Sequence, residues 1–279
     1  MIETIIKLKN LLLCFALFSA VSGCGTDRSM SPQQQGEKVS FVIKVPKELE
    51  PSVMHVMYRS ALCPRITRDG YGRPKAIDGH NGFDVTLQPG KNNLYATELY
   101  VDGGGSCKWR LSNVSFGVQY PVPTPFGNDA MPGGGGALVI VFDENNPQRR
   151  VFSPITVEGE VLDIVGDYYP LISEHFIDGH RRYVGLLGAD GGDLRYNAKQ
   201  ARKIYFEPVL HQEYIVKSIA PKKNVLGDFT KFYYPDGTVQ SHWRSEADFG
   251  KMQEIRLKAE AKKMKSFIVP NSALRNHYE

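Results

Sequence analysis

Hydrophobic and polar residues alternate with a period of two along most of this chain, which is the pattern of half-buried β-strands. Residues 39–45 show it clearly, with Val39, Phe41 and Ile43 on one face and Pro46 soon after them. The same pattern predicts strands over residues 53–58, 83–87, 94–101, 109–120, 137–142, 155–165, 182–187, 203–206, 214–219, 229–234 and 238–243.

One stretch near the C-terminus, residues 246–266, has the longer period of an α-helix. Its apolar edge is formed by Phe249, Met252, Ile255 and Ala259, and its outer face is rich in lysine. Glu254 and Lys258 are spaced to form an ion pair one turn apart. We therefore predict a mainly β (α+β) fold of antiparallel, sandwich-like sheets with one C-terminal helix.

Turn residues divide the strands into groups. The glycine-rich residues 102–106 lie between two predicted strands, so residues 94–101 and 109–120 are expected to pair as a hairpin, and Pro235-Asp236-Gly237 predicts another. The predicted organisation is a β-rich domain over 39–145, a second β-rich half over 146–245, and a helix and tail over 246–279. Whether the two halves form one sandwich or two domains is left open.

Composition narrows the class of partner. The chain has 279 residues, of which 42% are hydrophobic and 23% are charged, as is ordinary for a globular protein. Its net charge of +4 is too small to indicate nucleic-acid binding, since proteins that bind nucleic acids concentrate Lys and Arg on one face. We expect no nucleic-acid partner.

The N-terminal segment consists of a basic start, an apolar run and a short stretch of small residues before a cysteine. Lys7 and Lys9 precede an apolar run over residues 11–21, and the run ends in Val21-Ser22-Gly23-Cys24. This ending closely resembles the lipobox of bacterial lipoprotein precursors. The alternative, a membrane-spanning anchor, would need about 20 apolar residues, which is more than this run provides.

The lipobox resemblance implies that residues 1–23 are a signal peptide and that Cys24 carries the lipid. The mature chain would then be held on a membrane by its lipid anchor without crossing it. The residue after the lipid-carrying cysteine is Gly25 rather than an aspartate. In a Gram-negative host, this resemblance implies that the protein is sorted to the outer membrane and faces the periplasm. The implication does not hold in a Gram-positive host. Residues 24–38 are polar and are predicted to be a flexible tether.

Two cysteines remain after this processing, Cys63 and Cys107. An even pair in an oxidising compartment predicts a disulfide. The alternative roles, a nucleophile or a pair of metal ligands, would need a base or further ligands, and neither cysteine lies in a Cys-x-x-Cys or Cys/His cluster.

No sequence motif indicates catalysis. The chain lacks a Gly-x-Ser-x-Gly elbow, a His-Glu-x-x-His zinc motif and a phosphate-binding loop, so we expect no catalytic residue, metal or cofactor. Three groups of polar residues could form a metal or acid–base site, but a structural role is the simpler expectation for each. The pairs Asp78/His80 and Asp178/His180 are expected to be Asp-Gly turns followed by exposed histidines. The oxygens of Asp190, Asp193 and Asn197 are expected to belong to a polar turn, and the carboxylates of Glu158, Glu160 and Asp163 are expected to face solvent.

Aromatic residues give a weaker indication of binding. Tyr168-Tyr169 and Tyr233-Tyr234 are adjacent pairs, and alternation is expected to bury one member of each and expose the other. Trp109 and Trp243 are the two tryptophans. Exposed aromatic residues serve as anchors in protein interfaces, and they also bind sugars.

Residues 101–114, together with Leu62-Cys63-Pro64, resemble segments of proteobacterial lipoproteins, some of which look like immunity proteins against secreted toxins such as type VI lipases. The resemblance implies a non-enzymatic, envelope-anchored protein that binds and neutralises a toxin. The alternatives are a structural or assembly lipoprotein of a secretion system or other envelope complex, and a sugar-binding or hydrolytic envelope protein. The expected contact surfaces are residues 65–82 and 120–136, chosen as the longest loops.

Overall fold

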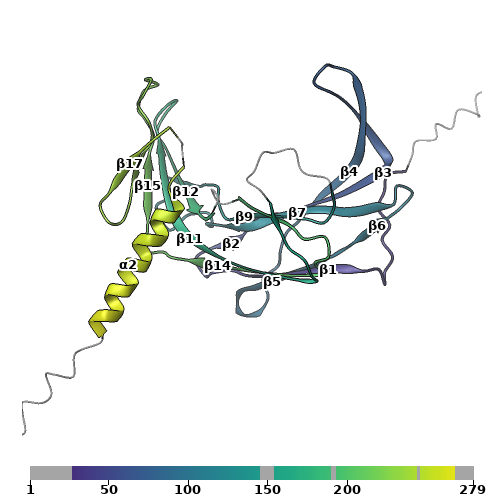
Figure 1. Cartoon of the computed structure of the whole chain (residues 1–279), viewed down its shortest axis with the longest axis horizontal. Coiled ribbons are helices and arrows are strands. Elements are labelled where there is room, and N and C mark those ends of the chain that lie inside the picture. The colour runs from purple at the N-terminus through teal and green to yellow at the C-terminus, as the bar shows by residue number, and fades with distance from the viewer. Residues whose placement is uncertain (1–26, 145–153, 190–192, 244–245, 268–279) are drawn as a thin grey trace, which may run out of the picture.

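The computed structural model describes residues 27–144, 154–189, 193–243 and 246–267, which form two β-sheets and a long C-terminal helix (Figure 1). The predicted mainly β fold with one C-terminal helix is confirmed. The strands are β1 (Lys38–Lys44), β2 (Glu50–Pro51), β3 (Met54–Arg68), β4 (Pro74–Val85), β5 (Leu94–Tyr100), β6 (Asp102–Gly104), β7 (Trp109–Gln119), β8 (Ala130–Pro132), β9 (Ala137–Val141), β10 (Ile155–Thr156), β11 (Val161–His175), β12 (Arg181–Leu187), β13 (Asp193–Asn197), β14 (Lys203–Leu210), β15 (Val216–Ile219), β16 (Lys231–Tyr233) and β17 (Val239–Ser241), and the helical elements are the 3-10 turn η1 (Lys91–Asn93) and α2 (Phe249–Phe267).

Both sheets contain strands from both halves of the chain. One has the order β17-β16-β15-β11-β14-β1-β5, with β12 also on β11, and the other has the order β10-β13-β9-β7-β3-β4, with β2 and β6 on β7. Because β1 lies between β5 and β14, and β13 lies beside β9, the two predicted halves interleave in one sandwich.

The pairing is mixed rather than purely antiparallel, which corrects the expectation from the sequence. β14 runs parallel to both β1 and β11, and β13 runs parallel to β9. Parallel neighbours cannot be joined by a tight turn and come from distant parts of the chain, as in the pairing of Ser40 with Lys203. The turn residues in the sequence therefore do not predict which strands pair in parallel.

The predicted hairpin of residues 94–101 with residues 109–120 is wrong. β5 pairs with β1 in one sheet, whereas β7 pairs with β3 and β9 in the other. The chain crosses between the sheets after β5, and the short β6 then forms the hairpin with β7. Gly104 and Gly105 have φ angles of 61° and 72°, so the glycine-rich turn is real but serves this shorter hairpin.

The main core lies between the two sheets. Phe41 of β1 and Phe206 of β14 meet Phe116 of β7 edge-to-face, with ring centroids 5.6 and 6.1 Å apart. These rings join the two layers, and the alternating apolar positions of β1 are buried among them as predicted.

β11 links the sandwich to a second core. Its first half pairs with β14, and its second half pairs with β12 and β15. Tyr168 is buried in the main core, whereas its neighbour Tyr169 is buried on the opposite face in the second core. The expectation that one of these tyrosines is exposed is therefore wrong, although it is right for Tyr233 and Tyr234, which are 37% and 4% exposed.

α2 covers this second core. Met252 is fully buried, and Phe249, Ile255 and Ala259 pack beside it, so the predicted apolar edge is the buried edge. The predicted ion pair between Glu254 and Lys258 is also present on the outer face.

Residues 27–37, the described part of the predicted flexible tether, are ordered along the sandwich. The backbone oxygen of Arg28 accepts a hydrogen bond from Trp109 Nε1 at 3.0 Å, and Ser31 N donates to Gly103 O at 2.9 Å. Met30 packs against the main core. These backbone contacts hold residues 27–31 along β6 and β7 despite their polar composition.

Candidate partner-binding surface

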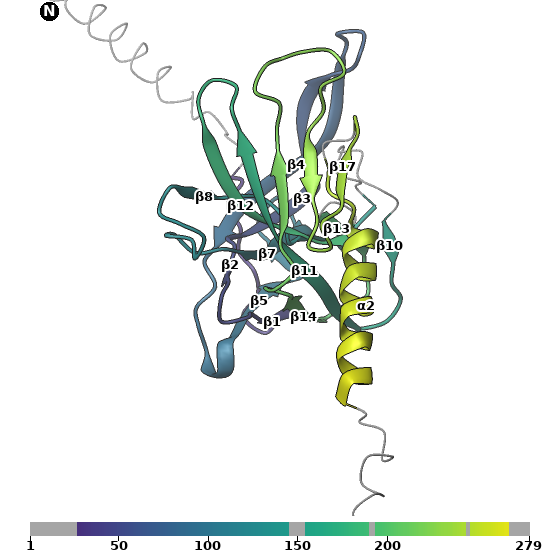
Figure 2. The ribbon, with the colours of Figure 1, turned by 90° about the vertical axis from the view of Figure 1, so that its left-hand side faces the viewer.

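Two projections rise from the same side of the sandwich and give the molecule the outline of a U (Figures 1 and 2). One is the outer part of the β3–β4 hairpin, residues 61–78, which we term the hairpin arm. The other, the sheet arm, consists of the second half of β11 with β12, β15, β16 and β17, covered by α2. The sequence predicted a contact loop over residues 65–82, but it did not predict that these residues belong to a projecting hairpin.

The hairpin arm is a two-stranded ribbon beyond the sheet. β3 pairs with both β4 and β7 up to Arg59, whereas its outer residues, Arg65 to Arg68, pair with β4. Residues 65–82, expected to be a loop, therefore form the end of β3, the tip of the hairpin and most of β4. Two-stranded ribbons are marginally stable on their own, so this arm depends on how its base and its tip are held.

A disulfide holds the base of the arm. Cys63 and Cys107 are bonded, with Cα atoms 5.4 Å apart, which confirms the predicted bridge. Ser60 Oγ donates to the backbone oxygen of Cys107 beside it. The β3–β4 register shifts here, and Gly79 lies so close to Cys63 that an added Cβ would be 1.9 Å from the Cys63 oxygen.

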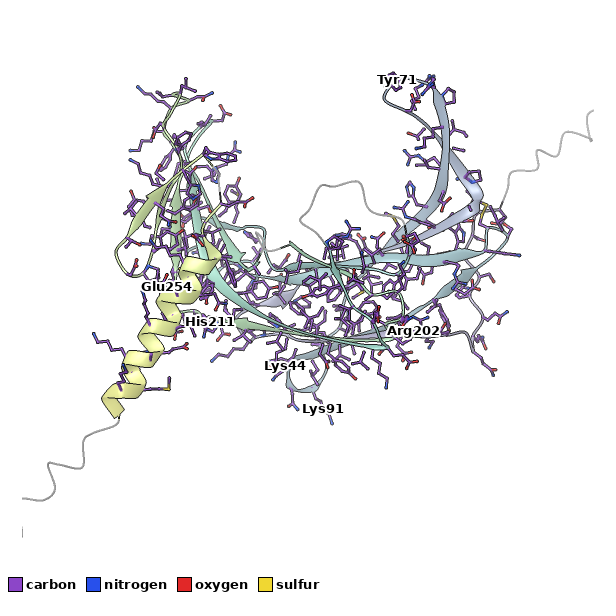
Figure 3. All side chains as sticks on the ribbon, in the orientation of Figure 1. Lys44, Tyr71, Lys91, Arg202, His211 and Glu254 are labelled. Atoms are coloured by element: carbon purple, nitrogen blue, oxygen red, sulfur yellow. A yellow bond between two sulfur atoms is a disulfide. The ribbon has the colours of Figure 1, made fainter. Side chains whose placement is uncertain are left out.

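A carboxylate organises the tip of the arm. Asp69 accepts hydrogen bonds from the backbone N–H groups of Tyr71 and Arg73 at 2.9 and 3.0 Å, and from Arg73 Nε at 2.9 Å. The hydrogen bond from the Arg73 backbone is the largest cause that lowers the Asp69 pKa. The Arg73 guanidinium lies over the Tyr71 ring, 5.1 Å from its centroid. Tyr71 is thereby presented at the end of the arm with 87% of its surface exposed (Figure 3).

The surface of the hairpin arm combines apolar and basic side chains. Leu62 and Ile66 are 61% and 66% exposed. The exposed basic residues of the arm are Arg65, Arg68, Arg73 and Lys75.

The outer end of the sheet arm has a similar character. The β11–β12 turn and the loop from β15 to β16 meet there, since Ala220 N donates to Glu174 O. Lys222 lies over the ring of Phe176, 5.6 Å from its centroid. The exposed apolar side chains of this end are Ile177, Val225, Leu226, Phe229 and Trp243.

A polar network fixes α2 to β11 at the point where the sheet arm joins the sandwich. Asp167 Oδ1 lies 2.7 Å from His211 Nε2, and Gln253 Nε2 donates to Asp167 Oδ2 at 2.7 Å. Arg256 completes the network by donating to Asp167 at 3.3 Å and to Tyr169 Oη at 3.0 Å. Burial raises the Asp167 pKa, but the hydrogen bonds from His211 and Gln253 and the Arg256 charge outweigh it and leave that pKa lowered. Figure 3 places His211 near α2.

The Asp/His pairs do not form a common site. Asp178 and Gly179 have φ angles of 60° and 105° and make the β11–β12 turn, as expected. The first pair differs, because Asp78 and Gly79 lie within β4 and Gly79 is buried, although His80 is exposed as expected. Among the described residues, no group of three or more His, Cys, Asp or Glu side chains is placed to hold a metal ion.

The other candidate oxygens are found at separate places, as far as the structure describes them. Glu158, Glu160 and Asp163 are exposed, as expected from alternation. Asp193 and Asn197 are the two ends of β13 rather than parts of one turn. Asp190 and the predicted lipid-attachment residue Cys24 lie outside the described residues.

Part of the loop over residues 120–136 is a strand that adds to the sheet arm. β8 within it pairs with β12, and Gly133 N donates to Val184 O at 2.7 Å. Val122 remains 72% exposed, whereas Thr124 and Ala130 are buried. Loop length alone therefore did not identify a free surface here.

Comparison with known proteins gives no relative. No family model, no curated protein and no solved structure matches this chain. Within the part of the chain that the structure describes, no helix is long and apolar enough to cross a membrane.

Proposed function

We propose that this chain is a lipid-anchored envelope protein that binds a protein partner with its two arms, and that it serves as a non-enzymatic immunity protein against a secreted antibacterial toxin. The hairpin arm carries the proposal. It is a ribbon beyond the sheet, held by a disulfide at its base and by Asp69 at its tip, and it keeps Leu62, Ile66 and Tyr71 exposed.

The residue types on the arms suit a protein interface. Aromatic and arginine side chains are the usual anchors of such interfaces, and apolar side chains gathered on a surface mark interaction sites. Tyr71 with Arg73 on one arm and Trp243 with Leu226 on the other supply these types. Because the hairpin arm carries four exposed basic residues, we expect an acidic partner surface.

The proposed anchor and the observed fold fit together. Cys24 precedes Asp27 by three positions, and Ser106 Oγ donates to the Asp27 backbone oxygen at the disulfide end of the sandwich. A lipid on Cys24 would hold this end of the protein near the membrane. An exported protein would also meet the oxidising conditions that the Cys63–Cys107 bond requires.

Contact-dependent competition tests the immunity role. The gene is deleted in its own bacterium, and the deletion strain is grown in contact with its toxin-producing parent. We expect the deletion strain to be killed, and to be rescued by the wild-type gene. The hairpin variant I66D/Y71A should fail to rescue it, whereas K91A, a change in the exposed η1 turn, should rescue it.

Equal survival of the deletion strain beside its parent contradicts the immunity role. A defect in secretion or envelope assembly in the deletion strain grown alone would instead support the structural alternative. Membrane fractionation of the rescued strains checks that each variant is produced and anchored.

A further inference from the structure

The second half of α2 projects beyond the body of the molecule (Figure 1). The first half is fixed to the second core by the buried Met252, whereas every side chain from Ala261 to Lys265 is exposed. The projecting end lies on the side of the sandwich opposite the two arms, as does the η1 turn (Figures 1 and 2). This end of the helix is therefore accessible to a partner.

An apolar stripe runs along the projecting end. It consists of Leu257, Ala261 and Met264, whose spacing of four and three residues aligns them on one side of a helix. Leu257 and Met264 are 54% and 64% exposed. The buried edge, which contains Met252 and Ala259, is offset from this stripe by about half a turn, so the stripe does not hold α2 to the sheet.

A row of lysines follows one flank of the apolar stripe. Lys258, Lys262 and Lys265 each come directly after one of its members, and all three are exposed. They repeat with the same spacing of four and three residues, so they also lie on one side of the helix.

The carboxylates near this row neutralise only its first member. α2 contains two of them, of which Glu254 pairs with Lys258 and Glu260 pairs with Arg256. The hydrogen bond that Lys258 donates to Glu254, and then the charges of Glu254 and Asp236, raise the Lys258 pKa.

The positive charge of the projecting end resides on Lys262 and Lys265. Neither has a carboxylate partner within the part of the chain that the structure describes. Lys263 is not counted with them, because it lies three residues after Glu260 and residues at this spacing are neighbours on a helix. Uncompensated positive charge therefore lies beside an exposed apolar stripe.

We infer that the projecting end of α2 binds the surface of an anionic lipid bilayer, with Lys262 and Lys265 near the headgroups and Leu257 and Met264 against the acyl chains. Helices that combine lysines with an apolar stripe bind such surfaces. A bilayer accommodates a convex, projecting helix end, whereas a protein partner would need a complementary groove. A membrane on this side would leave both arms facing away from it (Figures 1 and 2). The inference does not depend on the proposed immunity role, because it concerns lipid rather than the protein partner.

Vesicle sedimentation of the mature chain, residues 24–279, tests this inference. The C24S change removes the proposed lipid, so that the anchor itself cannot bind the vesicles. We expect binding to phosphatidylcholine vesicles that contain about a quarter phosphatidylglycerol, and binding at least about tenfold weaker to pure phosphatidylcholine. Raising the salt concentration from about 0.1 to about 0.5 M should also weaken binding.

Variants locate the binding on α2. K262Q/K265Q should weaken binding to the anionic vesicles at least about tenfold, because both lysines would lie near the headgroups. L257S/M264S should weaken it as well, since it removes the apolar side chains that would enter the bilayer. K75Q/K222Q, a matched loss of two exposed lysines from the two arms, should leave binding unchanged.

Equal binding of the wild type and K262Q/K265Q, or equal binding to the two kinds of vesicle, would overturn the inference. An equal loss in K75Q/K222Q would also overturn it, because net charge alone would then explain the attraction. Sedimentation with neither kind of vesicle would overturn it too and would leave this face to a protein partner. Circular dichroism shows that each variant is folded, and replacement of the exposed Lys262 and Lys265 is not expected to impair folding.

Discussion

Asp167 joins three elements through its two carboxylate oxygens. It lies on β11, faces His211 beyond the end of β14, and accepts hydrogen bonds from Gln253 and Arg256 on α2. Since these contacts lower its folded-state pKa, Asp167 stabilises the fold in the ionised form.

This pKa shift gives a pH dependence with a definite sign. The contribution is fully present above the unfolded-state pKa, near the ordinary value of 3.8, and is lost as the pH falls through the lower folded-state value. Replacement by D167N should therefore reduce stability at pH 7, by about 1–3 kcal/mol for lost charge-assisted hydrogen bonds, and should flatten the dependence on pH below about 4. Urea unfolding followed between pH 2.5 and 7 measures both effects. An unchanged pH profile in D167N would show that the network does not stabilise the fold.

Gly79 occupies a position where no side chain fits. Its missing Cβ would lie 1.9 Å from the Cys63 backbone oxygen, so G79A requires the β3–β4 backbones to move apart. We expect a loss of at least about 2 kcal/mol in the free energy of unfolding. Gly70, in the tip of the same arm, has no atom within 4 Å of its Cβ position, so G70A is the control and should change stability little. Chemical denaturation compares the two, and equal stabilities would contradict the packing described here.

At the scale of elements, α2 is held mainly by one edge. M252A removes a fully buried side chain of the second core and should lower the free energy of unfolding by about 2–5 kcal/mol. M264A is the same substitution at a side chain that is 64% exposed, and its free energy of unfolding should stay within about 0.5 kcal/mol of the wild-type value. Hydrogen exchange of the α2 amides, measured with thermal unfolding, distinguishes undocking of the helix from global unfolding. Equal losses of stability in M252A and M264A would contradict the assignment of Met252 to the buried edge of α2.

The disulfide closes a loop of 44 residues that contains most of the hairpin arm. Loss of the bond in a C63S/C107S variant should cost about 4 kcal/mol on the chain-entropy account, with native strain reducing the figure. Reductant should destabilise the wild type and leave the variant unaffected, as measured by guanidinium unfolding. A wild type that is equally stable with and without reductant would exclude a stabilising role for the bond.

Local patterns predicted individual elements better than their pairing. The alternation of residues 39–45 and the apolar edge of α2 identified the correct faces, because burial on one side imposes a period on the sequence. The parallel neighbours of β14 left no such trace, since their pairing depends on distant parts of the chain. Tyr168 and Tyr169 were misjudged because β11 contributes to two cores on opposite faces.

The candidate surface was predictable in part for the same reason. The bridge between Cys63 and Cys107 was predicted because the expected processing leaves these two cysteines as a pair. Residues 65–82 were expected to be a contact loop, and their strand structure was missed because β4 is mostly exposed on both faces and therefore lacks alternation.

For the whole molecule, the central feature is a sandwich that carries two arms on one side (Figures 1 and 2). Figure 3 places Tyr71 at the end of the hairpin arm, far from Lys91 on the opposite side of the sandwich. The arms therefore offer a partner two separated contacts, which together would hold it more tightly than either alone.

Affinity purification from the native envelope tests this account most directly. The wild type, the hairpin variant I66D/Y71A and the control K91A are tagged, and the bound proteins are quantified by mass spectrometry. We predict that one secreted protein is recovered in stoichiometric amount with the wild type and K91A, and is lost with I66D/Y71A. Recovery of the same partner with all three proteins, or of no partner with the wild type, would contradict a partner-binding role for the arms.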